Sequence, residues 1–455
     1  FATGAGERRM KISPARTGAF DILARIEGEN AFSSILLPQV TARLSDADRN
    51  LCYELVLGSL RRQMYLDAVI SQFAGEKKLD SEVRTALRLG LFQIIFLDRV
   101  PAHAAINESV NLVLRSRKRS ARGFVNAILR KASAGVPELK FEDPVGEICV
   151  MTSHPRWLVS KWVADFGLEA AAAICTANNE PVSPAFRLTS RYFKEFGRSE
   201  ATIEKICSDL GLKIGSIRES GLVADCYFAD EGRKQLRRAA EKGYVYFQDA
   251  GSQLVANAVQ IRLGGSLLDL CASPGGKVTK IAAQAEMSRS ICVAADLSTS
   301  RVLNLKANCN HQGLESVDVL QLDATRELPF SGGSFDAVLV DAPCTGTGTI
   351  RHNPEIRYIV KSEDIHAKQE KQRRILENAS KAVKVGGLLI YATCSLEREE
   401  NEGVVSSFLT GNKTFALRKP NAPGRFIQES GYLRTFPSDF EGDGFFMATF
   451  IRNAE

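Results

Sequence analysis

Leu268-Asp269-Leu270-Cys271-Ala272-Ser273-Pro274-Gly275-Gly276-Lys277 is the stretch of sequence that decides the fold. An apolar, strand-like run ends here, and a helical segment begins near Val278. Glycine has no Cβ and tolerates a positive φ, so the backbone of Gly275 and Gly276 can approach a ligand closely. Ligands of doubly wound α/β sheets bind at such turns, outside the carboxyl ends of the strands. The stretch therefore predicts the first strand and the ligand-binding turn of an α/β domain.

Further strand-like runs alternate with helical segments along the rest of the chain. They lie at residues 291–295, 317–320, 337–340 and 388–392. Such alternation is typical of a mostly parallel sheet with helices on both faces. We therefore expect an α/β Rossmann-like domain over residues 246–455.

An aspartate stands at the end of each of the next three strands: Asp296, Asp323 and Asp341. Ribose hydroxyls and an adenine amino group need acceptors, which carboxylates supply. Each aspartate could instead cap a helix, but three of them at one edge of the sheet favour a ligand. The first turn lacks the G-x-G-x-x-G that a nicotinamide-binding domain would carry. The predicted cofactor is therefore S-adenosylmethionine.

Two cysteines follow strands at this same edge, Cys344 after the fourth strand and Cys394 after the fifth. Cysteine is often buried and merely packs, which is our interpretation of the other eight. The loops around Cys344 and Cys394, rich in Pro and Gly or in Thr and Ser, favour reactive thiols instead.

Two thiols and an acid fit the methylation of cytosine at carbon 5. That carbon is too weak a nucleophile until a thiolate adds at carbon 6. The proton on carbon 5 must then leave, which gives a second group a role in proton removal or release. Asp341 could hydrogen-bond the ring nitrogen N3 and the exocyclic amine as the thiolate adds. The spacing alone leaves open which cysteine attacks.

Composition narrows the class of protein. The chain has 455 residues, 44% of them apolar and 25% charged, with a formal net charge of +6. Its length predicts two or three domains. We find no apolar stretch near the roughly 18 residues that a membrane span needs and no apolar signal core near the N-terminus. The ten cysteines form no C-x-x-C pair and no cluster at zinc-ligand spacing, which favours reduced thiols. We expect a cytoplasmic enzyme with no metal and no membrane partner.

The N-terminal part of the chain carries most of the excess positive charge. Helical spacing of apolar residues over residues 11–135 predicts an all-α domain, and the mixed pattern of residues 138–245 predicts a small α+β linker domain. A basic cluster in the first of these could neutralise phosphates, although such clusters are often solvated helix ends. It consists of Arg115, Arg117, Lys118, Arg119 and Arg122.

These motifs resemble those of the Nop/Sun family of RNA 5-methylcytosine methyltransferases, and nearly the whole chain is similar to the bacterial RsmB type. The resemblance rests on the cofactor turn, on Asp341-Ala342-Pro343-Cys344, on Thr393-Cys394-Ser395, on Phe247-Gln248-Asp249 and on Asp443-Gly444-Phe445-Phe446. It implies a class I methyltransferase fold, with Cys394 as the nucleophile and Cys344 as the helper for proton removal and product release. It also implies cofactor contacts from residues at the sheet edge: Cys271, Ala272, Ser273, Pro274, Gly275, Gly276, Lys277, Asp296, Arg301, Asp323 and Asp341.

The resemblance extends to residues 11–135, which are similar to the NusB-type helical RNA-binding domain at residues 105–110 and 123–129. The basic cluster lies between these two stretches, so we expect it to contact RNA. The implied substrate is a specific cytosine of the small-subunit (16S) rRNA, methylated by a monomeric enzyme. A tRNA or a 23S rRNA target stays an alternative, and a non-catalytic rRNA-binding assembly factor is a further one.

Overall fold

The structure is a computed structural model that describes residues 12–75, 77–197, 201–287 and 290–454. These residues form two compact units. The first contains the described residues up to Glu180 together with Ile350–Val360, and the second contains Pro181–Thr349 together with the residues from Lys361 onward. None of the helices in the described ranges is both long and apolar enough to cross a membrane.

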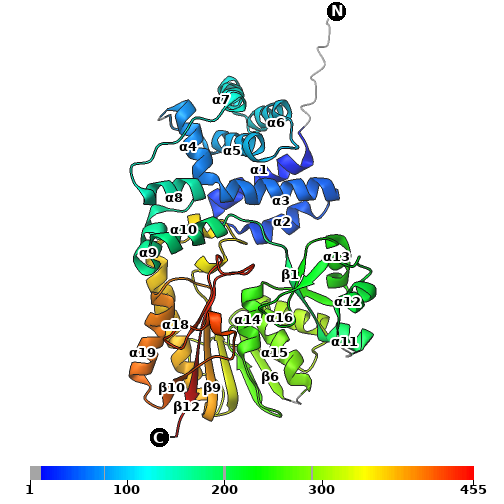
Figure 1. The fold of residues 1–455 in the computed structure, drawn as a ribbon, viewed down its shortest axis with the longest axis vertical. Coiled ribbons are helices and arrows are strands. Elements are labelled where there is room, and N and C mark those ends of the chain that lie inside the picture. Colours follow the sequence, from blue (N-terminus) through cyan, green and yellow to red (C-terminus); the bar gives the residue numbers. More distant parts are fainter. Residues whose placement is uncertain (1–11, 76, 198–200, 288–289, 455) are drawn as a thin grey trace, which may run out of the picture. The chain divides into compact units, whose positions relative to one another are not determined.

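The first unit is helical (Figure 1). Its helices are α1 (Pro14–Glu29), α2 (Ser33–Thr41), α3 (Asp46–Arg61), α4 (Gln63–Ala74), α5 (Ser81–Phe96), α6 (Ala102–Arg115), α7 (Arg122–Ala134), α8 (Pro144–Thr152), α9 (Arg156–Phe166), α10 (Leu168–Ala177) and α17 (Ile356–Ile359). Helix α1 begins at Pro14, and the Ser45 side chain accepts the Asp48 N–H at 3.2 Å ahead of α3. Apolar residues at helical spacing, among them Ile22, Leu55 and Leu87, fill one core.

A segment far along the chain completes this first unit. Arg357 of α17 is buried and donates from Nη1 to the Thr152 carbonyl at 2.9 Å and to Asn179 Oδ1 at 3.0 Å. The Glu355 carboxylate accepts the backbone N–H of Ser33 at 2.7 Å. Residues 350–360 therefore pack with the N-terminal helices, although the sequence pattern assigns them to residues 246–455. The division between units also falls inside the predicted linker of residues 138–245, so the three-domain boundaries stay a prediction.

The second unit contains two sheets. The smaller one is antiparallel, in the order β2 (Ile217–Glu219), β3 (Tyr227–Ala229), β1 (Ala185–Leu188), β4 (Val245–Phe247), and is accompanied by α11 (Ser190–Phe196), α12 (Ile203–Leu210) and α13 (Arg233–Glu241). The larger one has the order β10 (Phe415–Arg418), β12 (Phe446–Arg452), β9 (Val383–Thr393), β8 (Phe335–Asp341), β5 (Ser266–Asp269), β6 (Ile291–Asp296), β7 (Asp318–Gln321), with β11 (Leu433–Arg434) beside β12. Strands β5 to β9 run parallel, while β10, β11 and β12 are antiparallel to their neighbours.

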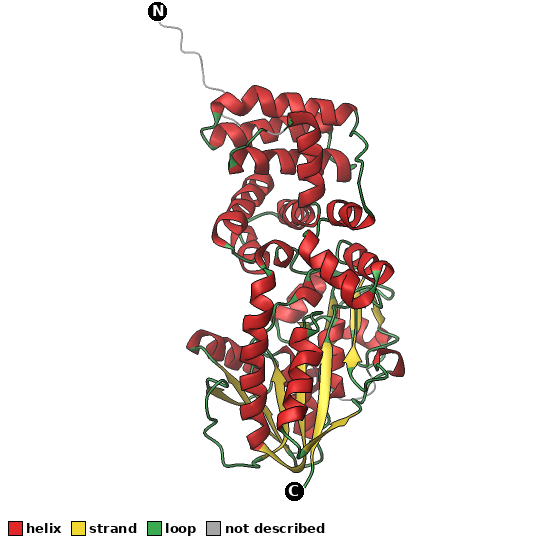
Figure 2. Cartoon of the chain, turned by 90° about the vertical axis from the view of Figure 1, so that its left-hand side faces the viewer, coloured by secondary structure: helices red, strands yellow, loops and turns green. Residues whose placement is uncertain are grey.

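Helices cover both faces of the larger sheet (Figures 1 and 2). On one face, α14 (Ala250–Ala258), α15 (Gly276–Met287) and α16 (Thr299–His311) pack on side chains such as Leu267 and Ile390. On the other, α18 (Ser362–Ala382) and α19 (Val404–Gly411) pack on the neighbouring residues Leu268 and Leu389. Successive residues of a strand point to opposite faces, so each of these strands must be apolar throughout. The predicted strands and the predicted two-sided helical cover are confirmed.

Candidate functional site

The predicted cofactor turn connects β5 to α15 at the carboxyl edge of the parallel strands. Its backbone is bound to the neighbouring strand β6. The Ala272 N–H donates to the Ala295 carbonyl at 2.9 Å, and the Ser273 N–H donates to Asp296 Oδ2 at 3.1 Å. Gly275 has φ +112°, a conformation that favours glycine. The turn forms here because glycine at position 275 permits the positive φ and because the Asp296 carboxylate binds the backbone N–H of Ser273.

The predicted acids stand at the ends of their strands. Asp296 and Asp341 are the last residues of β6 and β8, and Asp323 follows β7. Asp296 is buried, and its Oδ1 lies 3.5 Å from Nη1 of Arg301, another predicted cofactor residue. Asp323 accepts the N–H and the hydroxyl of Thr325 at 3.0 and 2.6 Å. Asp323 thus makes local turn bonds like those of a capping aspartate, while Asp296 holds the cofactor turn.

Lys277, the last residue of the cofactor turn, forms an ion pair with Asp341. Its Nζ lies 2.7 Å from Asp341 Oδ2 and 4.9 Å from the centre of the Phe445 ring. Burial lowers the pKa of Lys277, but the ion pair with Asp341 outweighs it and keeps the pKa above its ordinary value. Lys277 therefore stays charged and stabilises the Asp341 carboxylate beside the cysteine loops.

Asp269, the last residue of β5, belongs to this edge but was missed as a site residue by the sequence patterns. Only 1% of it is exposed, its Oδ1 accepts the Cys271 N–H at 3.3 Å, and its Oδ2 has no hydrogen-bond partner within the described ranges. Burial, with a smaller contribution from the Asp341 charge, raises the pKa of Asp269 to about 8. Its position as the final residue of the first strand was the signal available in the sequence.

The carboxylate acceptors at this edge of the sheet fit S-adenosylmethionine. The buried, unsatisfied Oδ2 of Asp269 can accept from an ammonium group, and Asp296 and Asp323 offer carboxylates at the ends of the next two strands. The Pro274 carbonyl, in contrast, is already occupied by Asn308 Nδ2 at 2.8 Å. Carboxylates at three successive strand ends match a ligand that has a cationic end and a ribose.

The two predicted reactive thiols meet at this edge. The Sγ atoms of Cys344 and Cys394 lie 3.3 Å apart, and both residues are partly exposed. The hydrogen bond with Cys394, together with burial, raises the pKa of the Cys344 thiol well above its ordinary value. The raised pKa favours the thiol form of Cys344, and either sulfur can donate the hydrogen bond between them. Apart from Cys271, which is partly exposed, the remaining cysteines are buried, in agreement with a packing role.

Close backbone packing holds the two cysteine loops against the C-terminal part of the chain. The Gly348 N–H donates to the Cys394 carbonyl, and the Gly444 N–H donates to the Gly348 carbonyl, both at 2.9 Å. A Cβ on Gly348 would lie 2.1 Å from the Gly444 carbonyl oxygen, so no other residue fits there. Gly348 is thus required by this contact.

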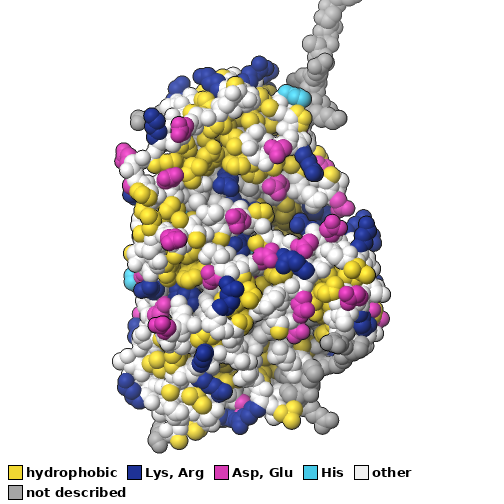
Figure 3. All heavy atoms as spheres, viewed as in Figure 1, with side chains coloured by type: hydrophobic (Ala, Val, Ile, Leu, Met, Phe, Trp, Pro, Cys, Tyr) yellow, Lys and Arg dark blue, Asp and Glu magenta, His cyan; other side chains and the backbone are white. Residues whose placement is uncertain are grey.

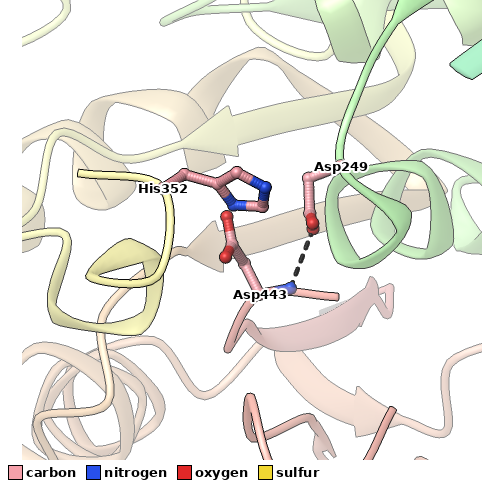
Figure 4. A group of neighbouring side chains, drawn as sticks. All are labelled: Asp249, His352 and Asp443. Atoms are coloured by element: carbon pink, nitrogen blue, oxygen red, sulfur yellow. Dashed lines mark hydrogen bonds between the residues drawn. The ribbon is translucent and has the colours of Figure 1, made fainter. Parts of the chain in front are cut away.

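The Phe247-Gln248-Asp249 motif is joined to the same C-terminal segment (Figure 4). Asp249 Oδ1 caps α14 by accepting the Gly251 N–H at 2.7 Å and also accepts the Asp443 N–H at 3.0 Å. His352, the third residue drawn in Figure 4, belongs to the first unit. The motif therefore has a structural role in the second unit.

The basic cluster of the first unit is partly neutralised by acids. Arg115 Nη1 and Nη2 donate to Asp21 at 2.8 and 2.9 Å, and Lys118 Nζ lies 2.9 Å from Asp80 Oδ2. Arg117, Arg119 and Arg122 are exposed. On the face of the molecule that Figure 3 shows, basic and acidic side chains are likewise interspersed.

Family models match both ends of the chain. Residues 13–134 match the NusB family, and residues 257–451 match the family model described as 16S rRNA methyltransferase RsmB/F. A probable ribosomal RNA small subunit methyltransferase B of Bacillus subtilis is 32% identical over 97% of this chain and 99% of its own length.

The chain belongs to the RsmB/F family of 16S rRNA methyltransferases. The ribosomal RNA small subunit methyltransferase B of Pseudomonas putida is 31% identical over the same shares of the two chains. Like the other RsmB/F enzymes, the protein is an S-adenosylmethionine-dependent methyltransferase of ribosomal RNA. The predicted family, enzyme class and cofactor are confirmed.

Solved structures agree on the fold of this RsmB/F protein. The crystal structure of PH0851 has a TM-score of 0.77 at 24% identity and covers 97% of this chain and 99% of its own. NSun6 from Pyrococcus horikoshii, solved with SFG, has a TM-score of 0.55 at 23% identity and covers 66% and 99%. The predicted combination of a helical NusB-like part and a Rossmann-like methyltransferase sheet is confirmed.

Proposed function

We propose that this enzyme methylates carbon 5 of a specific cytosine in small-subunit rRNA, with Cys394 as the covalent nucleophile. The observation that carries the proposal is the 3.3 Å approach of the Cys344 and Cys394 sulfur atoms at the strand edge that also holds the Lys277–Asp341 ion pair. A thiolate is needed because carbon 5 becomes nucleophilic only after a nucleophile has added at carbon 6.

The two cysteines take different roles in this proposal. Cys344 has a raised pKa and keeps its proton, so it can donate a hydrogen bond to the Cys394 sulfur. Cys394 forms the bond to carbon 6. After carbon 5 is methylated, Cys344 passes its proton to the departing Cys394 sulfur and, as a thiolate, accepts the proton of carbon 5. The electron pair of that C–H bond restores the double bond between carbons 5 and 6 as the bond between carbon 6 and Cys394 breaks. Cys344 assists this release because a proton beside the departing sulfur stabilises it as a leaving group.

Asp341 binds the base in this scheme. Its carboxylate, held by Lys277, can accept a hydrogen bond from the exocyclic amine of cytosine, and from N3 once N3 gains a proton as the thiolate adds. When bound, S-adenosylmethionine supplies the methyl group. The turn of residues 271–277, Asp269, Asp296, Arg301 and Asp323 would hold it.

The first unit would recruit the RNA. The exposed arginines of its basic cluster can contact phosphates, and such contacts position an RNA without reading its sequence. The target base must be unstacked or flipped to reach the two thiols. We propose that the enzyme acts as a monomer in the cytoplasm.

Bisulfite mapping of RNA tests the substrate and the product together. A strain that lacks the gene should lose one 5-methylcytosine in 16S rRNA, and the wild-type gene should restore it where the Cys394→Ala gene does not. Loss of the mark from tRNA or from 23S rRNA would establish the alternative substrates. An unchanged pattern of 5-methylcytosine in 16S rRNA, 23S rRNA and tRNA would refute cytosine methylation by this enzyme.

A further inference from the structure

Glu400 is a buried carboxylate between the two cysteine loops. It lies in the π-helical segment Glu399–Gly403, downstream of Cys394, and is 0% exposed. Carboxylates are rarely this buried unless their oxygens are satisfied. The partners of Glu400 therefore indicate what it does.

One set of partners belongs to the Cys344 loop. Thr345, the residue after Cys344, donates its backbone N–H to Glu400 Oε2 at 3.0 Å and its hydroxyl to Oε1. Gln372 of α18 donates from Nε2 to Glu400 Oε2 at 2.8 Å and to the Pro343 carbonyl at 3.2 Å. The residues on both sides of Cys344 are thus held by Glu400 or by its partner Gln372.

The other partner belongs to the Cys394 loop. Ser395, the residue after Cys394, donates its hydroxyl to Glu400 Oε1 at 2.7 Å, and its Oγ lies 3.0 Å from that of Thr345. Glu400 Oε1 therefore receives a hydroxyl from each cysteine loop. Its own carbonyl also accepts the Tyr391 hydroxyl from β9 at 2.5 Å.

All the groups that reach this carboxylate are donors, which an ionised carboxylate can satisfy and an amide cannot. Hydrogen bonds to a charged group are stronger than neutral ones, and a low local dielectric strengthens them further. The network joins two loops that are 50 residues apart in the chain. Each bridged residue stands directly beside a cysteine, so a change at Glu400 would act on both cysteine loops.

We propose that Glu400 is a positioning residue that sets the separation of the Cys344 and Cys394 thiols. It touches neither sulfur in this scheme and acts through Thr345 and Ser395. Its effect on catalysis rests on the proposed two-thiol mechanism, but its effect on thiol separation does not.

Oxidation by diamide measures the thiol separation without any RNA. Diamide oxidises two neighbouring thiols to a disulfide while its azo bond is reduced to a hydrazine. In the full-length protein we expect Glu400→Gln to slow Cys344–Cys394 disulfide formation by roughly one to two orders of magnitude, because misplacing reacting groups by about 1 Å costs rates of that order. Peptide mass spectrometry identifies the pair, and Cys344→Ala gives the background from the other cysteines.

Glu402→Gln is the matched control, since Glu402 lies in the same segment but pairs with Arg434 at 2.7 Å. It should keep the wild-type oxidation rate. Ser395→Ala removes a single link to Glu400 and should slow oxidation less than Glu400→Gln, so it tests the proposal even where Glu400→Gln does not fold. Wild-type oxidation rates in both the Glu400 and the Ser395 variants would overturn the proposal.

A second readout uses RNA and separates positioning from general damage. Glu400→Gln should accumulate a covalent protein–RNA adduct relative to product, because release depends on Cys344 lying beside Cys394. General unfolding would instead lower adduct and product together. If Cys344→Ala accumulated no adduct while Glu400→Gln still slowed oxidation, the two-thiol mechanism would fail and the positioning role would stand.

Discussion

Asp341 of β8 is the register partner of Ala392 of β9, and this pairing brings Cys344 beside Cys394 across fifty residues of sequence. The two strands are parallel neighbours, so their carboxyl ends finish at the same edge. Each cysteine follows its strand end within a few residues. The proximity of the two thiols is therefore a consequence of strand order.

Cys394→Ala should abolish methylation, whereas Cys344→Ala should leave attack intact and slow release. The first variant lacks the nucleophile, and the second lacks the proton beside the departing sulfur. Denaturing gels of enzyme incubated with labelled rRNA and S-adenosylmethionine should show a retained covalent adduct for Cys344→Ala alone. An adduct that formed with Cys394→Ala and not with Cys344→Ala would exchange the two roles.

Asp269→Asn should change how stability depends on pH. The folded-state pKa of Asp269 is about 8, above its ordinary value of 3.8. Between these values the folded state binds a proton that the unfolded state has lost, so the wild-type free energy of unfolding falls as the pH rises from about 4 to 8. The variant removes this dependence.

Thermal unfolding without cofactor, at pH 5 and pH 8, measures the effect. The difference in melting temperature between Asp269→Asn and wild type should be a few degrees more favourable to the variant at pH 8 than at pH 5. About 1 kcal/mol shifts the midpoint by 2–4 °C in domains of 150–250 residues. The same variant should bind S-adenosylmethionine more weakly in calorimetric titration. An equal difference from wild type at both pH values would exclude a raised pKa.

Replacing Arg119 and Arg122 together by Ala should weaken rRNA binding and reduce its salt dependence. Both side chains are exposed. Each lost phosphate contact should lower the slope of log affinity against log salt by about 0.7–0.9. Arg115→Ala is the control, because Asp21 already balances that charge. Equal losses for Arg115→Ala would mean that the ion pair opens on RNA binding.

Arg187→Met should destabilise the second unit and loosen the cofactor turn. Arg187 of β1 is buried and donates to Gln248 Oε1 at 2.8 Å, Thr279 Oγ1 at 2.6 Å and Gln312 Oε1 at 2.9 Å. Each buried polar group left unsatisfied costs about 1–3 kcal/mol, so the free energy of unfolding should fall by about 3 kcal/mol in urea titrations. Arg191→Met, at a more exposed site, should cost less.

The Met substitution should also weaken cofactor binding. Arg187 Nη2 lies 3.3 Å from the Gly276 carbonyl at the start of α15. A variant with reduced stability and unchanged affinity for S-adenosylmethionine would show that the hydrogen bonds of Arg187 stabilise the second unit but do not hold the cofactor turn.

The sequence predicted the strands of the larger sheet because each is an apolar run set between helical segments. It predicted the cofactor turn because Gly275 and Gly276 lie between the first strand and the next helix, where a positive φ and a close approach to a ligand favour glycine. It also marked Cys344 and Cys394 as unusual, since each stands just beyond a strand. Such signals are local and can be read from neighbouring residues.

Other features depended on contacts between distant residues. The packing of residues 350–360 with the N-terminal helices rests on buried bonds such as Arg357 to Thr152, for which no local pattern exists. Asp269 appeared as an ordinary strand-end residue until its burial and its unpaired oxygen were known. The partial neutralisation of the basic cluster likewise required Asp21, from another helix.

The sequence by itself determined that this protein carries a parallel α/β methyltransferase sheet, a glycine turn for the cofactor and two thiols at strand ends. Only the tertiary structure decided that the thiols lie 3.3 Å apart, that this contact and burial raise the pKa of Cys344, and that Glu400 joins their loops. The physical reason is that local sequence fixes where strands begin and end. Strand order and burial fix which groups meet and how their pKa values change.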